Sequence, residues 1–219
     1  YATRVSRSYQ PMKRRRHFPL GDLPLALYAL ITKAILPLFL ARRRLRDDEE
    51  YVLARVRKDH RDWMCASLDI RSRKGPVAVA VASIDPEFAL KYATKALRSD
   101  ADFVLFCVTE KSAALIHADE ELKGDREIVL AAVGKDGWTL AYAANALKGD
   151  REIVLAAVGK DGWALEYAAN ALKGDREIVL AAVSNTGTAL EYVHEALRSD
   201  REIVLAAVGE DGHALEYVH

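Results

Sequence analysis

Hydrophobic and polar positions repeat with a period of 25 residues in the second half of the chain. Residues 125–149 read DREIVLAAVGKDGWTLAYAANALKG, and residues 150–174 match them at all but two positions. Further copies begin at Asp175 and Asp200 without any change in spacing. A fixed period of this length predicts stacked supersecondary units, each of which covers the apolar face of its neighbour.

Weaker copies extend the pattern towards the N-terminus. DADFVLFCV, which begins at Asp100, keeps the pattern of DREIVLAAV, and FALKYATKALRS, which begins at Phe88, keeps that of WALEYAANALKG. The sequence therefore predicts a repeat array over residues 47–219. Its units are a degenerate one at 48–74, five in strict register at 75–99, 100–124, 125–149, 150–174 and 175–199, and a partial one at 200–219.

Each unit is expected to contain two short helices. An Asp, whose carboxylate can accept hydrogen bonds from free N–H groups, precedes the apolar run Ile128–Val133. This run could also be a buried strand, but the capping residue and two alanines favour a helix. A second helix is expected at 138–147, with Trp138 and Tyr142 as neighbours on one face. The predicted caps are Asp100, Asp125, Asp150, Asp175 and Asp200.

The second helix of each unit carries recurring aromatic residues. The positions that we expect to line the packing face or a groove are Phe88, Trp138, Trp163, Tyr142, Tyr167 and Tyr192. His117 and His213 occupy the same two slots in other units. Together, the paired helices predict an all-α fold, namely an α-solenoid of two-helix units of ~25 residues.

Residues 1–46 differ from the array in charge. They hold eleven Lys and Arg and one acid, whereas the remainder holds 21 basic and 31 acidic residues. This division of charge suggests that the basic N-terminal segment attaches the protein to another structure and that the acidic repeat array has a separate role. The first 21 residues contain no acid, which is typical of an organelle transit sequence but equally of a basic tail.

An apolar stretch at residues 23–40 lies between two basic clusters and is interrupted by Lys33. Eighteen helical residues span ~27 Å, slightly less than the ~30 Å hydrocarbon core of a bilayer. Three alternatives remain: a helix that lies on or docks against a membrane, a spanning helix, and a soluble helix that covers the first repeat. The expected membrane-docking or partner-docking residues are Arg14, Arg15, Arg16, Leu27, Leu30, Ile31, Leu38, Phe39, Arg42, Arg43 and Arg44.

Catalytic and metal-binding patterns are weak. Gly159–Gly162 reads GKDG, which is not a phosphate-binding loop and is interpreted as a turn. The six histidines lack a metal-ligand spacing, and no cofactor is predicted. Cys107 stands where later units have Ala, so we expect a buried core residue.

The charged positions at the start of each unit form a further pattern. Stacking would place the repeated Asp, Arg and Glu of the DRE triplet in ladders down one edge. In the simplest interpretation these residues are solvent-exposed and the Asp residues cap helices. The alternative is that they form a charged strip that binds a partner. Nucleic acid is an improbable partner because the basic clusters flank an apolar stretch and the rest of the chain is acidic.

The DREIVLAAV…GWALEYA…LK signature resembles the helical repeat family known as domain of unknown function 4116. The resemblance covers residues 75–219 well and 48–74 weakly. It implies an α-helical tandem repeat, and it assigns no catalytic residue to this chain.

These features favour a non-catalytic accessory or scaffold subunit of a larger assembly at an organelle membrane, such as a photosynthetic or respiratory complex. Its partners would be other protein subunits, with the membrane surface or membrane-embedded subunits contacted through residues 1–46. A plastid or a mitochondrion, on the stromal or matrix side, is the expected location. The alternatives are a soluble, cytoplasmic adaptor that binds peptides or proteins, and an enzyme with a site in the degenerate region 48–75.

Overall fold

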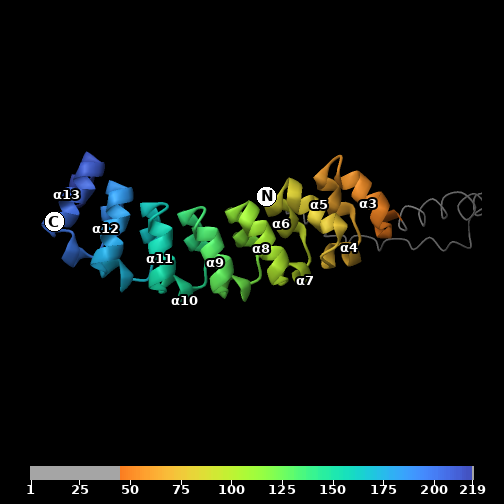
Figure 1. Ribbon diagram of the computed structural model, residues 1–219, viewed down its shortest axis with the longest axis horizontal. Coiled ribbons are helices and arrows are strands. Elements are labelled where there is room, and N and C mark those ends of the chain that lie inside the picture. Colours follow the sequence, from red (N-terminus) through yellow and green to blue (C-terminus); the bar gives the residue numbers. More distant parts are fainter. Residues whose placement is uncertain (1–44, 219) are drawn as a thin grey trace, which may run out of the picture. The chain divides into compact units, whose positions relative to one another are not determined.

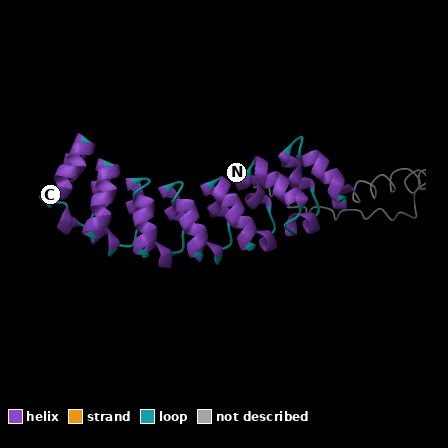
Figure 2. Cartoon of the chain, viewed as in Figure 1, coloured by secondary structure: helices purple, strands orange, loops and turns teal. Residues whose placement is uncertain are grey.

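The computed structural model describes residues 45–218, which are built from helices and contain no strand (Figures 1 and 2). The chain divides into two compact units, and the second runs from Leu45 to His219. The predicted apolar helix at 23–40 and both basic clusters around it lie outside the described residues. The expected all-α fold of tandem repeats is confirmed for the described part.

Each repeat unit begins with an α-helix. These helices are α3 (Glu49–Val56), α5 (Pro76–Ile84), α8 (Ala101–Glu110), α9 (Arg126–Val133), α11 (Arg151–Val158), α12 (Arg176–Asn185) and α13 (Arg201–Glu210). The IVLAAV run is therefore helical, as predicted, and not a strand. From α8 onwards, each helix packs against the next one along the chain (Figure 1).

A second, tighter helix follows each of these. It is a 3₁₀ helix in all described units except 75–99, where it is α6. The segments are η3 (His60–Cys65), α6 (Pro86–Tyr92), η4 (Ser112–His117), η6 (Gly137–Tyr142), η7 (Gly162–Tyr167), η9 (Gly187–Tyr192) and η11 (Gly212–Tyr217).

A short helical turn completes the units up to residue 199. These turns are α4 (Leu68–Ser72), α7 (Lys95–Arg98), η5 (Leu122–Gly124), α10 (Asn145–Lys148), η8 (Leu172–Gly174) and η10 (Glu195–Leu197). The expectation of one continuous helix at 138–147 is therefore wrong. Ala143 and Ala144 adopt extended backbone between η6 and α10, which redirects the chain towards the next unit.

Aspartates cap the first helices. The Asp125 carboxylate accepts hydrogen bonds from the backbone N–H groups of Glu127 and Ile128, at 2.9 and 3.1 Å. Asp100, Asp150, Asp175 and Asp200 occupy the equivalent N-cap positions and accept in the same way. These bonds satisfy N–H groups that have no partner within a helix.

The unit ends at Gly149 without a left-handed glycine cap. Gly149 has φ −99°, and no glycine of the described residues has a positive φ. The left-handed cap that a glycine after Lys148 commonly forms is therefore not used. Instead, Asp150 N–H donates to the carbonyl of Leu147, which closes a tight turn directly into α11.

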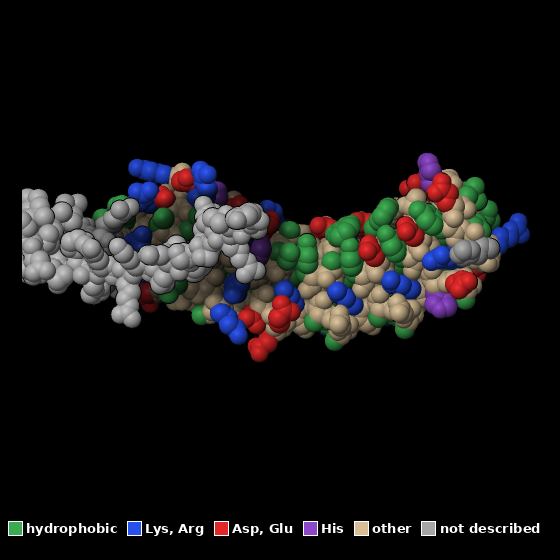
Figure 3. Space-filling view, turned by 180° about the vertical axis from the view of Figure 1, so that it is seen from behind, with side chains coloured by type: hydrophobic (Ala, Val, Ile, Leu, Met, Phe, Trp, Pro, Cys, Tyr) green, Lys and Arg blue, Asp and Glu red, His purple; other side chains and the backbone are tan. Residues whose placement is uncertain are grey.

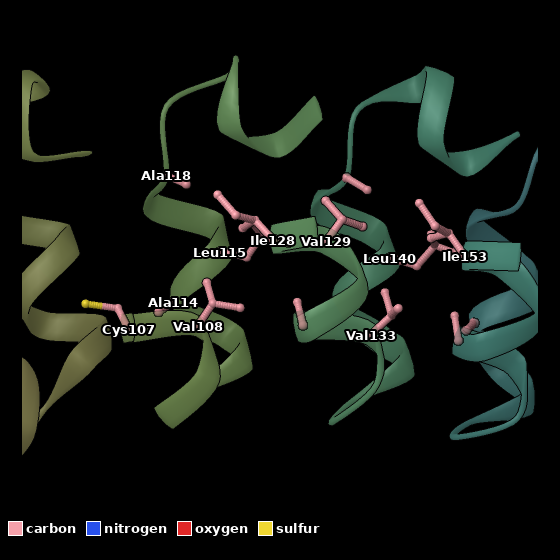
Figure 4. Packing of buried hydrophobic residues seen from close by; sticks show 14 of the residues in the cluster. Cys107, Val108, Ala114, Leu115, Ala118, Ile128, Val129, Val133, Leu140 and Ile153 are labelled. Atoms are coloured by element: carbon pink, nitrogen blue, oxygen red, sulfur yellow. The ribbon is translucent and has the colours of Figure 1, made fainter. Parts of the chain in front are cut away.

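The core lies between the layer of α-helices and the layer of 3₁₀ helices, and it continues from unit to unit. In unit 125–149 the buried apolar side chains are Ile128, Val129, Ala132, Val133, Leu140 and Ala143. Figure 4 shows that side chains of successive units meet in the space between the helices. Burial of one Leu or Ile contributes roughly 1.5–3 kcal/mol, so this shared core stabilises helices that are individually too short to persist.

Backbone hydrogen bonds also join consecutive units. Ala144 N–H donates to the carbonyl of Lys123 at 2.9 Å, and Ala169 N–H donates to that of Lys148 at 2.8 Å. The degenerate first unit uses the same bond, because Ser67 N–H donates to Arg46 at 3.0 Å. This inter-unit hydrogen bond is thus kept even where the sequence has diverged.

The glycine that opens the 3₁₀ helix sets the distance between units. A Cβ placed on Gly162 would lie 2.3 Å from the carbonyl oxygen of Ala182 in the next unit, and Gly137 and Gly187 have the same close approach. Interpretation of the GKDG segment as only a turn was therefore incomplete. Gly212 occupies the same position in the last unit, with nothing within 4 Å of such a Cβ.

This geometry predicts opposite outcomes for one substitution at two equivalent positions. Gly162→Ala should destabilise the array by about 1–3 kcal/mol, because the added methyl must push two backbones apart. Gly212→Ala should leave stability unchanged or slightly higher, since Ala is the better helix former. Urea denaturation followed by circular dichroism measures both. Equal stability of the two variants would contradict the assigned role of the glycine.

Candidate protein-binding surface

The charged edge of the array is occupied by contacts between units. The Arg126 guanidinium pairs with the Asp150 carboxylate at 3.4 Å and also with Glu152, both in the following unit. Arg151 pairs with Asp175 at 3.1 Å and with Glu177, and Arg176 with Asp200 at 3.6 Å and with Glu202. The ladder thus consists of ion pairs that connect each unit to the next. Neither the solvated edge nor the partner-binding strip proposed from the sequence anticipated these pairs.

These contacts shift the titration of the capping carboxylates. Hydrogen bonding from the Ile153 N–H, assisted by the charge of Arg126, holds the pKa of Asp150 below its ordinary value. The pKa of Asp200 is lowered in the same way, first by the Ile203 N–H. Arg126, Arg151 and Arg176 therefore already have carboxylate partners within the array.

A second surface carries exposed aromatic side chains. Trp138 is 45% exposed and Trp163 is 37% exposed, which is unusual for a residue of this size. Half-buried tyrosines of the same 3₁₀ layer lie beside them. We call this surface the aromatic strip; it consists of Trp138, Trp163, Tyr142, Tyr167, Tyr192 and Tyr217.

The aromatic pairs of the strip form between units. Trp138 contacts Tyr167 with ring centroids 4.9 Å apart, and Trp163 contacts Tyr192 at 5.9 Å. The predicted pairing of Trp138 with Tyr142 within one unit is not found. In a 3₁₀ helix each residue turns by about 120°, so side chains four residues apart point in different directions.

Carboxylates accompany the tyrosines along the strip. Burial, and then the Glu166 charge, raises the pKa of Tyr167, and the same two causes in the same order raise the pKa of Tyr192. The pKa of Tyr217 is raised first by Glu191. Sequence reasoning missed these glutamates, although their spacing of 25 residues was visible.

The space-filling view shows the setting of these groups. A band of hydrophobic side chains follows the units along one side of the array, with acidic side chains beside it (Figure 3). Glu166, Glu191 and Glu216 form no ion pair among the described residues, unlike Glu152, Glu177 and Glu202 of the charged edge. The strip therefore presents exposed apolar area together with negative charge that no ion pair neutralises.

The remaining predicted aromatic slots behave differently. Phe88 packs against Tyr92 of its own helix at 4.5 Å and against His60 at 4.8 Å, so it belongs to a separate cluster. His117 is half-buried near Glu87, and burial lowers its pKa. His213 was expected in a packing slot, but its side chain is exposed and lies 2.8 Å from the Asp211 carboxylate.

The cysteines and the possible metal ligands of the described residues do not form a site. Cys107 is fully buried, and this burial raises the pKa of its thiol to about 12, whereas Cys65 is exposed. Residues 45–218 contain no group of three or more His, Cys, Asp or Glu side chains arranged to hold a metal ion. Within the same range, no helix combines the length and apolarity needed to cross a membrane. The docking residues predicted between Arg14 and Arg44 lie outside this range.

The units of the array define a tandem helical repeat protein. The family model described as Domain of unknown function (DUF4116) matches residues 125–173 and 175–219 as two consecutive segments. Residues 125–219 therefore match tandem repeats of the DUF4116 family, as the signature indicated. No curated protein and no solved structure matches the chain.

The charged edge predicts an acid-dependent loss of stability. The folded-state pKa values of Asp150 and Asp200 lie below the unfolded value of about 3.9, so their stabilisation is complete above that pH and is lost as the pH falls through the folded values. Asn caps helices as well as Asp but does not titrate. A variant with both Asp→Asn changes should therefore lose less melting temperature between pH 7 and pH 3 than the unchanged chain.

A matched control for this measurement removes two charges elsewhere. Glu50→Gln with Glu127→Gln changes the net charge equally, at exposed positions outside the ion-pair ladder. This variant should show the pH dependence of the unchanged chain. The explanation fails if the aspartate variant and the control titrate alike.

Proposed function

We propose that this chain is a non-catalytic scaffold or accessory subunit, whose helical repeats hold a partner protein on the aromatic strip. The observation that carries the proposal is the exposure of Trp138 and Trp163 in a continuous row with tyrosines. Trp and Tyr provide much of the binding energy in protein interfaces, because a rigid ring buries a large apolar area. Both Trp side chains are held by rings of the next unit, so the surface is ordered before a partner arrives.

The position of the strip within the fold supports the same proposal. Its side chains project from the 3₁₀ layer, whereas the ion pairs that connect the units lie at the start of the α-helices. A partner on the strip can therefore bind without disrupting the ladder. The repeated geometry gives an extended partner several equivalent contacts, whose effects combine.

In this proposal, residues 1–46 attach the scaffold to an organelle membrane or to membrane subunits. The support is their sequence alone, which has one basic cluster on each side of the apolar stretch 23–40. A soluble adaptor remains the alternative, and it would use the same strip without the attachment. The two functions differ in membrane retention and not in partner binding.

Loss of the two exposed rings should remove the partner. We expect Trp138→Ala combined with Trp163→Ala to reduce a specific set of co-purifying proteins by at least about tenfold, since interface Trp residues commonly cost 2 kcal/mol or more when truncated. Quantitative mass spectrometry after capture in mild detergent measures this. Val79→Ala removes an exposed apolar side chain from α5 and serves as the control. Identical protein sets for all three chains would refute the proposed interface.

Membrane attachment requires a separate measurement on the full chain. Leu30→Ser with Ile31→Ser should release the chain from membranes under carbonate extraction, because polar groups in the apolar stretch weaken its partition into lipid. Leu205→Ser, an exposed apolar position of α13, should leave retention unchanged. Release of the unchanged chain itself would favour the soluble adaptor.

A further inference from the structure

The aromatic strip is also electrically asymmetric, which restricts the chemistry of its partner. Outside the DRE triplets of the charged edge, residues 150–218 contain seven acidic and three basic side chains, whereas residues 125–149 contain one acidic and two basic side chains. The excess negative charge therefore lies at the C-terminal units. Two of the three cations there, Lys173 and Arg198, donate to backbone carbonyls, those of Glu166 and Glu191.

Each aromatic pair is combined with a carboxylate. Glu166 is close enough to influence both Tyr167 and Tyr192, and Glu191 influences both Tyr192 and Tyr217. Trp and Tyr faces attract cations, most strongly Arg, and a nearby carboxylate adds a direct ion pair. A cationic side chain is therefore the group that fits each pair, whereas the phosphates of nucleic acid or lipid would be repelled.

The spacing of the pairs restricts the backbone of the partner. Adjacent packed helices lie roughly 8–10 Å apart, so the pairs recur at about that distance. A polyproline II segment rises 3.1 Å per residue with three residues per turn, which places every third side chain on one face about 9 Å apart. Cations at every third position of such a segment match successive units of the strip.

We infer that the strip of residues 138–217 binds an extended basic segment of a partner protein, with Lys or Arg at every third position packed against the exposed area of the Trp and Tyr rings. The inference rests on the proposed function and specifies the chemistry of the partner. Charge complementarity and the matching periods of the strip and the segment carry it.

A synthetic peptide (Arg-Pro-Pro)₄ tests the inference directly. Fluorescence anisotropy of the labelled peptide with the full chain at low salt should show saturable binding that weakens as salt is raised. Glu166→Gln with Glu191→Gln, which keeps the shape of the side chains, should weaken binding about tenfold. Trp138→Ala with Trp163→Ala should weaken it by a similar factor. Melting curves of each variant establish that the fold is retained.

Two controls separate the strip from general charge attraction. Glu50→Gln with Glu127→Gln removes the same charge outside the strip and should leave the affinity within about twofold of the unchanged chain. The peptide (Glu-Pro-Pro)₄ should not bind. Equal weakening by both glutamate variants, binding of the acidic peptide, or no saturable binding of the basic peptide would each overturn the inference.

The chain's own basic residues provide one further outcome. If the full chain binds the peptide only after Arg14–Arg16 and Arg42–Arg44 are changed to Ser, the occupant is a segment of this chain and the proposal of a partner protein is overturned. Failure of the inference is distinguishable from failure of the proposed function. If protein capture depends on the strip but the basic peptide does not bind, only the inference of a basic partner segment is rejected. If neither is observed, the proposed interface itself is rejected.

Discussion

The structure depends on how closely each unit approaches the next. The α-helices of the described units hold four to ten residues, too few to be stable alone in water. Their stability comes from contact with neighbours, and Gly137, Gly162 and Gly187 approach a carbonyl oxygen of the following unit so closely that a Cβ would not fit. The glycine allows the two layers of one unit to fit against the next, and the backbone bond from Ala144 to Lys123 fixes the same register on the other side.

The same stacking produces the candidate binding surface. When units are stacked, an exposed side chain at the same position of each unit forms a row. The rings of the aromatic strip touch only because consecutive units are in register. Trp163 contacts a tyrosine 29 positions further along the chain, so unfolding of either unit would also remove this aromatic pair from the strip. Folding and binding are therefore coupled, and each lost unit removes one contact for the partner.

Much of the architecture was predictable because its signals are local or periodic. The Asp caps, the alanine-containing apolar runs and the 25-residue period gave the helices, their order and the family. The 3₁₀ conformation of GWALEY could not be predicted, because six residues fit a period of 3.6 almost as well as one of 3.0. The role of Gly162 and the pairing of Arg151 with Asp175 and Glu177 depend on groups 20 to 26 positions away, whose approach only the stacked coordinates define.

The position of Glu166 within the unit shows how the array can vary its surface without altering its fold. The residues at this position, from unit 75–99 onwards, are Lys91, Ile116, Ala141, Glu166, Glu191 and Glu216. The first α-helix and the glycine-to-carbonyl contact do not involve this side chain, so its charge is free to change. Core positions such as Leu140, Leu165 and Leu190 remain identical because they fill the space between layers. Packing therefore fixes the spacing of the surface, and the outward positions determine which chemistry that surface recognises in each unit.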